Sequence, residues 1–315
     1  MAENNDLHFS PLSNGLDFLL AGLEVLEGDP SPRQVKYAVL HVAAGIALVH
    51  KERLRREHWA LIFDDVRAAT KERYESGEFR SVDFEACLQR LEDICGIEIG
   101  DETKSRLRSL VRRRNRIEHF GISEPLVAAK ASVSAVLGHV IAFIDQHLAP
   151  LGAEDAEVME QIRELLGGFE KFVQDRWKEI NGDVQEHRQH TAVVECPRCS
   201  QEALGLGDGD AKCFFCGYKA DAEKAADEYL ANVSGLSEYA VVKDGGEWPC
   251  YQCPDCDWET FVACDTDYVC FNCGTTYSAK TLDRCPRCNR LYKPGHGEGY
   301  DPLCPDCWAN IASKD

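Results

Sequence analysis

The chain has 315 residues, of which 44% are hydrophobic and 28% charged, and this length allows two or more domains with separate cores. Its formal net charge of −19 argues against a protein that coats nucleic acid by bulk electrostatics. The first residues are acidic and polar and do not resemble a signal peptide, so the sequence predicts a cytoplasmic protein.

The first 150 residues show the apolar periodicity of helices and few alternating β-branched runs. Gly28, Asp29 and Pro30 end the first helix, and Ser31 with Pro32 provides an N-cap and a first-turn proline for the second. The expected helices span residues 13–27, 31–57, 59–74, 83–94, 103–120 and 123–148. We therefore expect a mainly α domain at residues 1–150, folded as an up-and-down helical bundle.

The apolar stretch around Val39 to Val49 lies in the second of these helices. It is interrupted by His41 and is too short to span a bilayer. We expect no membrane partner.

Positive charge gathers in the helix expected at residues 103–120. No acidic residue lies between Thr103 and Ile117, a segment with seven basic side chains. These are Lys104, Arg106, Arg108, Arg112, Arg113, Arg114 and Arg116. The segment forms a local anion site that the net charge of the chain conceals, and Arg108, Arg112, Arg113 and Arg116 are its candidate RNA-binding residues.

The same helix carries a motif with catalytic chemistry. Asn115 and His119 lie one helical turn apart on the same face, with Arg114 beside them. Histidine can take a proton from a ribose 2′-hydroxyl near neutral pH, and arginine can bind a phosphate and stabilise the charge of the transition state. Attack by the 2′-hydroxyl would need no catalytic metal and would leave a 2′,3′-cyclic phosphate.

Arg114-Asn115-x-x-x-His119, late in a helical domain of this size, resembles the Arg-x4-6-His ribonuclease motif of the HEPN superfamily. The resemblance implies RNA as the substrate and a homodimer through the helical domain, in which the motifs of two chains form one composite site. It also implies a toxin or antiviral defence setting. Members often carry a further acidic or polar residue on an earlier helix, for which Glu52 and Asp64 are candidates.

Three other interpretations stay open for this half of the chain. The arginine run can be the solvated face of a helix, with His119 interacting with the helix C-terminal dipole. The helical domain can be a non-enzymatic dimeric adaptor that binds protein or nucleic acid through the C-terminal modules. A weaker alternative is a factor associated with transcription or translation.

Residues 151–190 are expected to form an acidic helical linker, either a spacer or a docking helix, broken at Gly167-Gly168. A helical and turn connector is expected at residues 221–247, separating the first C-terminal module from the other two.

Twelve of the sixteen cysteines form six Cys-x-x-Cys pairs after residue 195. The pairs group as Cys196/Cys199 with Cys213/Cys216, Cys253/Cys256 with Cys270/Cys273, and Cys285/Cys288 with Cys304/Cys307. Each set of four thiolates can close tetrahedrally on one structural zinc ion. The sequence predicts three small, β-containing zinc ribbons, at residues 191–220, 248–282 and 283–315.

The register of the second ribbon has alternatives. Cys250 continues the Cys-x-x-Cys ladder and Cys264 lies in the loop, although Cys253 and Cys256 best match the other ribbons. His296 could replace a cysteine in the third ribbon. Cys87 and Cys95 are expected to be buried apolar residues of the helical half.

The acidic charge of the C-terminal half makes the ribbons poor general RNA binders, so we expect a protein partner or antitoxin there, or control of the basic helix. Their aromatic residues could stack on bases, but most are expected to fill the small ribbon cores. These are Phe214, Phe215, Tyr251, Trp258, Phe271 and Trp308.

Overall fold

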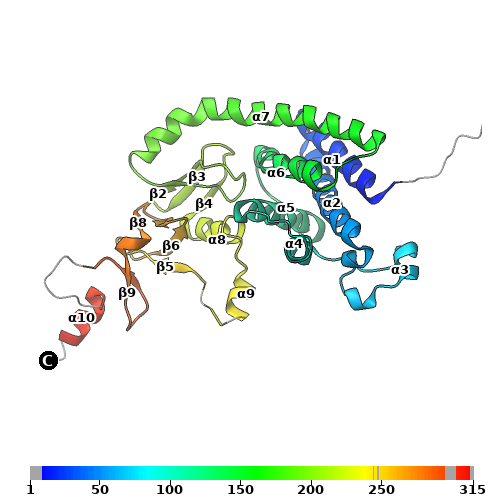
Figure 1. Cartoon of the computed structure of the whole chain (residues 1–315). Helices are drawn as coiled ribbons and strands as arrows, with labels where there is room; N and C mark the ends of the chain where they lie inside the picture. Colours follow the sequence, from blue (N-terminus) through cyan, green and yellow to red (C-terminus); the bar gives the residue numbers. More distant parts are fainter. Residues whose placement is uncertain (1–8, 244, 247, 295–302, 313–315) are drawn as a thin grey trace, which may run out of the picture. The chain divides into compact units, whose positions relative to one another are not determined.

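The structure is a computed structural model that describes residues 9–243, 245–246, 248–294 and 303–312. It consists of two compact units, Met1–Gln174 and Asp175–Asp315. The first is helical, and the second contains small antiparallel sheets with α-helices (Figure 1). The mainly α first half and the β-containing C-terminal modules are as expected from the sequence.

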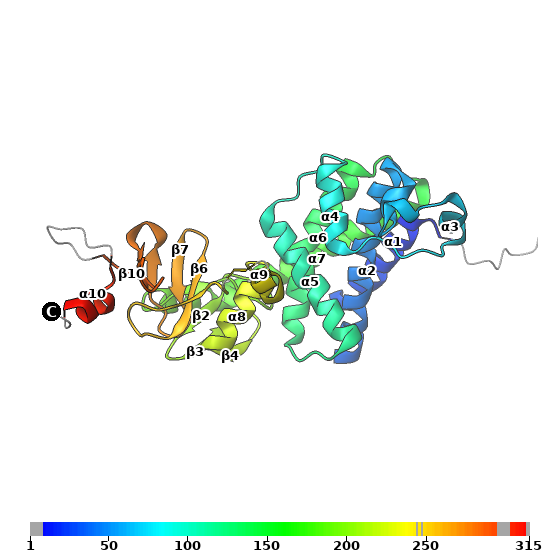
Figure 2. The same cartoon turned by 90° about the horizontal axis from the view of Figure 1, so that it is seen from below.

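Helices α1 (Pro11–Glu27) and α2 (Pro32–Glu57) form an antiparallel pair joined by the Gly28–Ser31 turn. Ser31 and Gln34 form a capping box, in which each side chain binds the backbone N–H of the other residue, and this fixes the start of α2. Helix α2 contacts α1, α4, α5 and α6, so it is the central helix of the unit. Figure 2 shows α5 running alongside it.

Glycines allow α1 and α2 to approach closely. A Cβ atom added at Gly45 would lie 2.6 Å from the Gly15 carbonyl oxygen and 2.6 Å from Leu19 Cγ. A Cβ atom added at Gly22 would lie 2.7 Å from Val42 Cγ2. The small residues therefore set the distance between the two helices, around which Leu19 and Val42 are buried.

Replacing Gly45 with alanine is expected to lower the free energy of unfolding by about 1–3 kcal/mol, because the added methyl group overpacks the contact. Gly138 is the matched control, since it is exposed within α6 (Leu126–His147) and an added Cβ meets nothing within 4 Å. There the same change should stabilise the protein by up to about 1 kcal/mol. Urea unfolding of both variants measures the difference, and equal effects would contradict the packing argument.

The segment after α2 is not the continuous helix expected at residues 59–74. It forms two 3-10 turns, Trp59–Ile62 and Val66–Ala68, followed by the short helix α3 (Lys71–Ser76). The Asp65 carboxylate accepts from Arg67 N, and the Thr70 hydroxyl accepts from Arg73 N. These local caps compete with helix continuation, and Arg90 of α4 (Phe84–Asp93) donates to the carbonyl oxygen of Phe63.

The last two helices before α7 differ in character. Helix α5 (Asp101–His119) carries the arginine run, and α6 is mostly apolar. Among the described residues, α6 is long and apolar enough to cross a membrane, a feature that the sequence reasoning around residues 39–49 missed. In the structure, 61% of its most apolar window is buried. Its composition therefore fits a core helix of this unit.

Helix α7 (Ala153–Arg188) runs without a break through Gly167 and Gly168, contrary to the expected interruption. Each helical glycine costs about 1 kcal/mol relative to alanine, but Met159, Ile162 and Phe169 are fully buried and offset this cost. The first part of α7 is therefore not a free spacer, and the first compact unit extends to Gln174 rather than ending at residue 150.

The second unit contains three cysteine-bearing modules. The first ribbon is a meander of β1 (Val193–Val194), β2 (Leu204–Gly207), β3 (Asp210–Cys213) and β4 (Lys219–Asp221), followed by α8 (Ala222–Asn232) and α9 (Glu238–Lys243). The second repeats this meander with β5 (Cys250–Gln252), β6 (Glu259–Cys264), β7 (Asp267–Cys270) and β8 (Thr276–Ser278). The third has a two-stranded sheet, β9 (Asp283–Arg284) and β10 (Leu291–Tyr292), and α10 (Pro305–Ala312).

The connector had suggested that the first ribbon stands apart from the second, but the two ribbons are in contact. Ala192 N donates to the Gly274 carbonyl at 3.2 Å, and Gly209 N donates to the Asn272 carbonyl at 3.0 Å. The connector helix α8 packs on β3, β4 and β6, and the Tyr229 ring meets that of Phe271 edge-on. The apolar face of α8 thus joins two sheets that are too small to bury it alone.

Candidate functional site

The end of α5 brings the predicted catalytic residues to the surface. Arg114 Nη1 lies 2.9 Å from Glu118 Oε2, and His119 Nε2 lies 3.8 Å from the same oxygen. The His119 side chain is 76% exposed, and Asn115 is also exposed. A guanidinium and an imidazole therefore gather around one carboxylate oxygen at the C-terminal end of the helix.

Beside this cluster, a pocket of about 540 Å³ opens between α2, the start of α4 and α5. Arg114 and Asn115 line it, whereas His119 is not among its lining residues. Its other polar lining residues are His50, Lys51, Ser81, Asp83, Glu85, Cys87, Arg108 and Arg112. Two residues of the predicted motif, Arg114 and Asn115, therefore line the pocket, whereas the third, His119, is exposed outside it.

The positively charged side chains of this pocket lie close enough to shift one another's pKa. Burial lowers the pKa of Lys51, and the nearby Arg114 lowers it further. Burial also lowers the pKa of Arg112, with a contribution from Arg108. Lys51 Nζ donates to Ser81 Oγ at 2.8 Å, and Arg108 Nη2 lies 2.8 Å from Glu85 Oε2.

The four candidate RNA-binding arginines have different surroundings. Arg108 and Arg112 line the pocket, and Arg116 is exposed. Arg113, in contrast, is only 5% exposed, and its Nε lies 2.7 Å from Glu124 Oε1. Its buried ion pair ties α5 to the start of α6, so the prediction that Arg113 contacts RNA is corrected.

Neither acidic candidate on the earlier segments lines the pocket. Glu52 is buried and binds Arg55 and Arg56 of the same helix, at 2.6 Å and 2.9 Å. Burial opposes its ionisation, but these two arginines outweigh that effect and lower its pKa. Asp64 pairs with Arg80 at 3.2 Å. Both carboxylates therefore have structural partners.

His50 is a pocket residue that no sequence motif singles out. Its Nδ1 lies 2.8 Å from the Ile46 carbonyl oxygen, and burial lowers its pKa to about 4. Because a carbonyl oxygen only accepts, Nδ1 carries the proton and Nε2 is left with a lone pair. That His50 and Lys51 both line this pocket could be seen only in the three-dimensional structure.

The predicted metal ligands do come together. Each of the three cysteine tetrads has its four sulfur atoms within 4.8 Å of one another and could hold a metal ion. Sulfur atoms placed tetrahedrally about 2.3 Å from a zinc ion would lie about 3.8 Å apart. The separations Cys196–Cys216, Cys199–Cys213 and Cys256–Cys270 are 3.9, 3.7 and 3.6 Å, which fit that geometry.

Hydrogen-bond donors point at several sulfur atoms of these clusters. Backbone N–H groups of Arg198 and Asp255 point to Cys196 Sγ and Cys253 Sγ at 3.4 Å each. Hydrogen bonding from Cys253, together with the Thr260 hydroxyl, lowers the pKa of Cys270 to about 4. The turns thus aim backbone N–H groups at the sulfurs, whereas burial and the neighbouring thiols raise the pKa of Cys196 and Cys199.

The structure resolves the register of the second ribbon. Cys253 and Cys256 belong to its tetrad, and Cys250 and Cys264 do not. Cys250 Sγ instead donates to the Glu259 carbonyl oxygen at 3.1 Å. His296, considered as a ligand of the third ribbon, lies outside the described residues.

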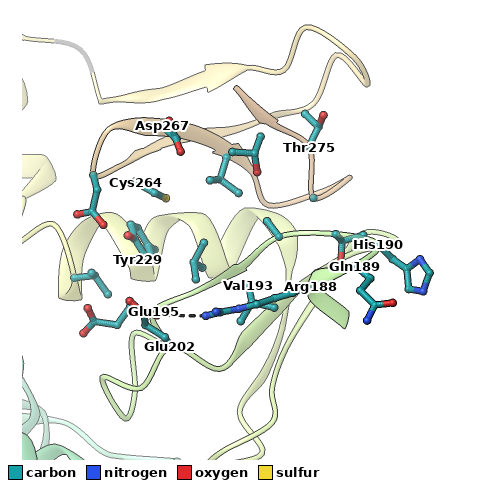
Figure 3. A pocket seen from close by; sticks show the side chains of 18 residues that line it. Arg188, Gln189, His190, Val193, Glu195, Glu202, Tyr229, Cys264, Asp267 and Thr275 are labelled. Carbon is teal, nitrogen blue, oxygen red and sulfur yellow. Dashed lines mark hydrogen bonds and ion pairs between the residues drawn. The ribbon is translucent and has the colours of Figure 1, made fainter. Parts of the chain in front are cut away.

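A second pocket, of about 640 Å³, lies between the first two ribbons (Figure 3). Four carboxylates line it, those of Glu195, Glu202, Asp265 and Asp267. Arg188 is bonded to Glu202 at 3.3 Å. The lining of this pocket is mainly negative, whereas the lining of the pocket in the helical unit is mainly positive. The two pockets therefore favour ligands of opposite charge.

No family model, curated protein or solved structure matches the chain. The resemblance to the HEPN superfamily therefore rests on the residues of the chain alone.

Proposed function

We propose that this chain is a metal-independent endoribonuclease of the HEPN type, active as a homodimer formed through the helical unit. The observation that carries the proposal is the gathering of Arg114 and His119 around the Glu118 carboxylate at the exposed end of α5. In the proposed complex, a phosphate oxygen of RNA takes the place of that carboxylate. The adjoining pocket adds further positive charge in a chain of strongly negative net charge.

In the proposed reaction, His119 takes the proton of a ribose 2′-hydroxyl. The 2′-oxygen bonds to the adjacent phosphorus, and the bond to the 5′-oxygen breaks, giving a 2′,3′-cyclic phosphate and a 5′-hydroxyl end. The leaving oxygen needs a proton, which His119 of the partner subunit would supply. Arg114 would bind the phosphate and stabilise its developing charge, and Asn115 would position RNA. A single imidazole cannot remove and donate a proton at once, and this favours the dimer.

An exposed ring beside the site supports RNA as the substrate. Phe120 follows His119 directly and its side chain is 96% exposed. A base next to the cleaved bond could stack on it, an interaction worth about 1–3 kcal/mol in single-strand binding.

The three cysteine tetrads would hold structural zinc, since four thiolates leave no position for a substrate. Phe215 and Phe271 are fully buried in the ribbons, whereas Trp258 and Trp308 are 51% and 54% exposed. The exposed tryptophans are the proposed contacts for a protein partner or antitoxin. By the family resemblance, the proposed setting is the cytoplasm and toxin or antiviral defence.

The competing function is a non-enzymatic dimeric adaptor. The observation that favours it is that Glu118 already pairs with Arg114 while His119 faces solvent in a single chain. An adaptor would require only the helical dimer and the exposed tryptophans of the ribbons.

An RNA oligonucleotide with a single 2′-deoxy substitution at its mapped cleavage position separates the two functions. The purified protein, treated briefly with EDTA so that structural zinc is retained, should cleave the all-ribose strand to 2′,3′-cyclic phosphate ends. It should leave the substituted position intact, because the nucleophile is missing. Cleavage at the deoxy position, or 3′-hydroxyl ends, would refute this chemistry. No cleavage by a dimeric, zinc-loaded protein would favour the adaptor.

A further inference from the structure

The pocket between the first two ribbons lies between strands at the edges of their sheets. Strand β1 is at an edge of the first sheet, and β8 is at an edge of the second. Val193 of β1 and Thr275, just before β8, line the pocket from opposite sides (Figure 3). Among the described residues, the backbone hydrogen bond that joins these edges is the one from Ala192 N to the Gly274 carbonyl oxygen, at 3.2 Å. Edge strands present backbone donors and acceptors to which another chain can add a strand.

The backbone of Val193 points away from its own sheet. The Ala192 carbonyl oxygen accepts from Leu206 N at 3.1 Å, and Cys196 N donates to the Gln201 carbonyl oxygen at 2.9 Å, so these groups face β2. Because successive residues of a strand direct their backbone N–H and C=O groups to opposite edges, Val193 directs its own pair outward. No backbone hydrogen bond outside the sheet ladders involves Val193 in the part of the chain that the structure describes. Its N–H and C=O groups are therefore available to a strand that lies in the pocket.

The side chains around this edge call for a cationic ligand. Four carboxylates line the pocket, those of Glu195, Glu202, Asp265 and Asp267, against the one guanidinium of Arg188. Arg188 already pairs with Glu202 at 3.3 Å. Neither Asp265 nor Asp267 has an ion-pair partner among the described residues. The lining therefore carries surplus negative charge that the chain itself does not neutralise.

The inner wall of the pocket feels this negative charge. Burial raises the pKa of Cys264 to about 12, and the charges of Asp265 and Asp267 contribute to the shift. Burial also raises the pKa of Tyr229, with contributions from Cys264, Glu195 and Asp265. Both wall residues therefore stay neutral, and a positively charged group in the pocket would offset the carboxylates without competing for them with a protein cation.

The size and surroundings of the pocket indicate what kind of cation enters it. Its volume of about 640 Å³ leaves room for long side chains such as lysine or arginine. The second unit has 25 acidic and 14 basic side chains, a field that attracts a basic partner. Residues 1–8 and 295–302, which lie outside the described residues, contain no lysine or arginine. The basic run of this chain forms the helix α5, which cannot pair as a strand. The ligand is therefore expected from another protein.

We propose that the edge of β1 and the acidic pocket beside it bind an extended basic segment of a partner protein. The segment adds a strand against Val193, a known mode of peptide recognition at sheet edges. Its lysine or arginine side chains lie among Glu195, Asp265 and Asp267. This inference goes beyond the ribonuclease reaction and does not depend on it, because all residues of the pocket belong to the second unit.

Fluorescence anisotropy with labelled hexapeptides and the full-length zinc-loaded protein tests the proposal. The probes are an alternating arginine–valine peptide, the same peptide with N-methyl groups on its backbone nitrogens, and an alternating glutamate–valine peptide. The arginine–valine peptide should bind more tightly than the glutamate–valine peptide, and more weakly as salt is raised. The N-methyl peptide should bind about tenfold more weakly than its parent, because it has the same charge but cannot donate backbone hydrogen bonds. Spermidine, an unlabelled competitor of the same charge without a peptide backbone, should displace the parent peptide poorly.

Variants of the protein locate the site. Asp265→Asn should weaken binding of the arginine–valine peptide about twofold to fivefold, the effect of one exposed ion pair, and adding Asp267→Asn should increase the loss. Asp208→Asn is the matched control, because Asp208 has a φ of 55° against 54° for Asp265 but does not line the pocket. It should keep the wild-type affinity. Val193→Pro removes the outward N–H and should weaken the peptide about tenfold, since proline is tolerated at an outward position of an edge strand.

Zinc content and thermal unfolding check that each variant folds. If Val193→Pro loses zinc, the N-methyl peptide alone decides the strand pairing. The proposal is overturned if peptides of opposite charge bind equally, or if the N-methyl peptide binds as tightly as its parent. It is also overturned if Asp208→Asn weakens binding as much as Asp265→Asn does, or if spermidine competes as well as unlabelled peptide.

RNA cleavage by the same preparation separates this inference from the proposed reaction. Peptide binding that depends on Asp265 and Val193, without RNA cleavage, would support the ribbon site and count against the nuclease. Cleavage of RNA by a protein that does not bind the arginine–valine peptide would do the reverse.

Discussion

Replacing Cys213 with serine is expected to remove one of three bound zinc ions and to unfold the first ribbon. Cys213 is fully buried within its tetrad, and the larger apolar side chains buried in the same ribbon are Leu204, Leu206, Phe215 and Tyr218. A structural zinc ion contributes on the order of 10 kcal/mol to the folding of such a module, which exceeds what a core of this size can replace. The second ribbon should also loosen, because it shares α8 and the Ala192–Gly274 hydrogen bond with the first.

The measurement is zinc per chain together with limited proteolysis. The wild type should bind three zinc ions, one for each tetrad, and Cys213→Ser should bind fewer and be cut within residues 191–278. Cys250→Ser is the matched control, because Cys250 lies outside the tetrads and donates to the Glu259 carbonyl. It should keep full zinc. An unchanged zinc content in Cys213→Ser would refute the assigned ligands.

Replacing His119 with alanine is expected to lower the rate of RNA cleavage by about a hundredfold to ten-thousandfold, the usual contribution of a general acid or base. The fold should be unaffected, because the side chain is 76% exposed and no core contact is lost. Arg114→Ala should lower the rate by a similar factor, because it removes the guanidinium that would neutralise the transition state.

Single-turnover cleavage of a labelled RNA, with unfolding curves for each variant, measures this effect. His190→Ala is the control, since His190 is an exposed histidine of the second unit and lies outside the α5 cluster. It should cleave at the wild-type rate. Cleavage by His119→Ala at the wild-type rate would exclude His119 as the acid or base and leave the exposed cluster without a catalytic role.

Local signals accounted for the elements that the sequence predicted well. The Ser31–Gln34 capping box and the turn at Gly28 define the boundary of α1 and α2 within a few neighbouring residues. The break expected at Gly167-Gly168 was wrong because burial of Phe169 outweighs the low helix propensity of two glycines. The continuous helix expected after Trp59 was wrong because the Asp65 and Thr70 side chains cap the starts of separate short turns there.

The arginine run shows the limit of the same reasoning at the candidate site. In the sequence, Arg112, Arg113 and Arg116 are equivalent cations. In the structure, Arg112 lines a pocket, Arg113 is buried against Glu124 and Arg116 is exposed. Helical phase alone could not assign these places, because they depend on which neighbouring helix each face of α5 meets.

The sequence by itself determined the helical character of the first half and the twelve cysteines of the three tetrads that could hold a metal ion. Both depend on short-range spacing, since caps and Cys-x-x-Cys knuckles act within a few residues. Only the tertiary structure decided that ribbons one and two share hydrogen bonds and α8, that Arg113 is buried and that His50 lines the basic pocket. These outcomes depend on packing between elements distant in the chain, where burial and charge pairing outweigh local preference.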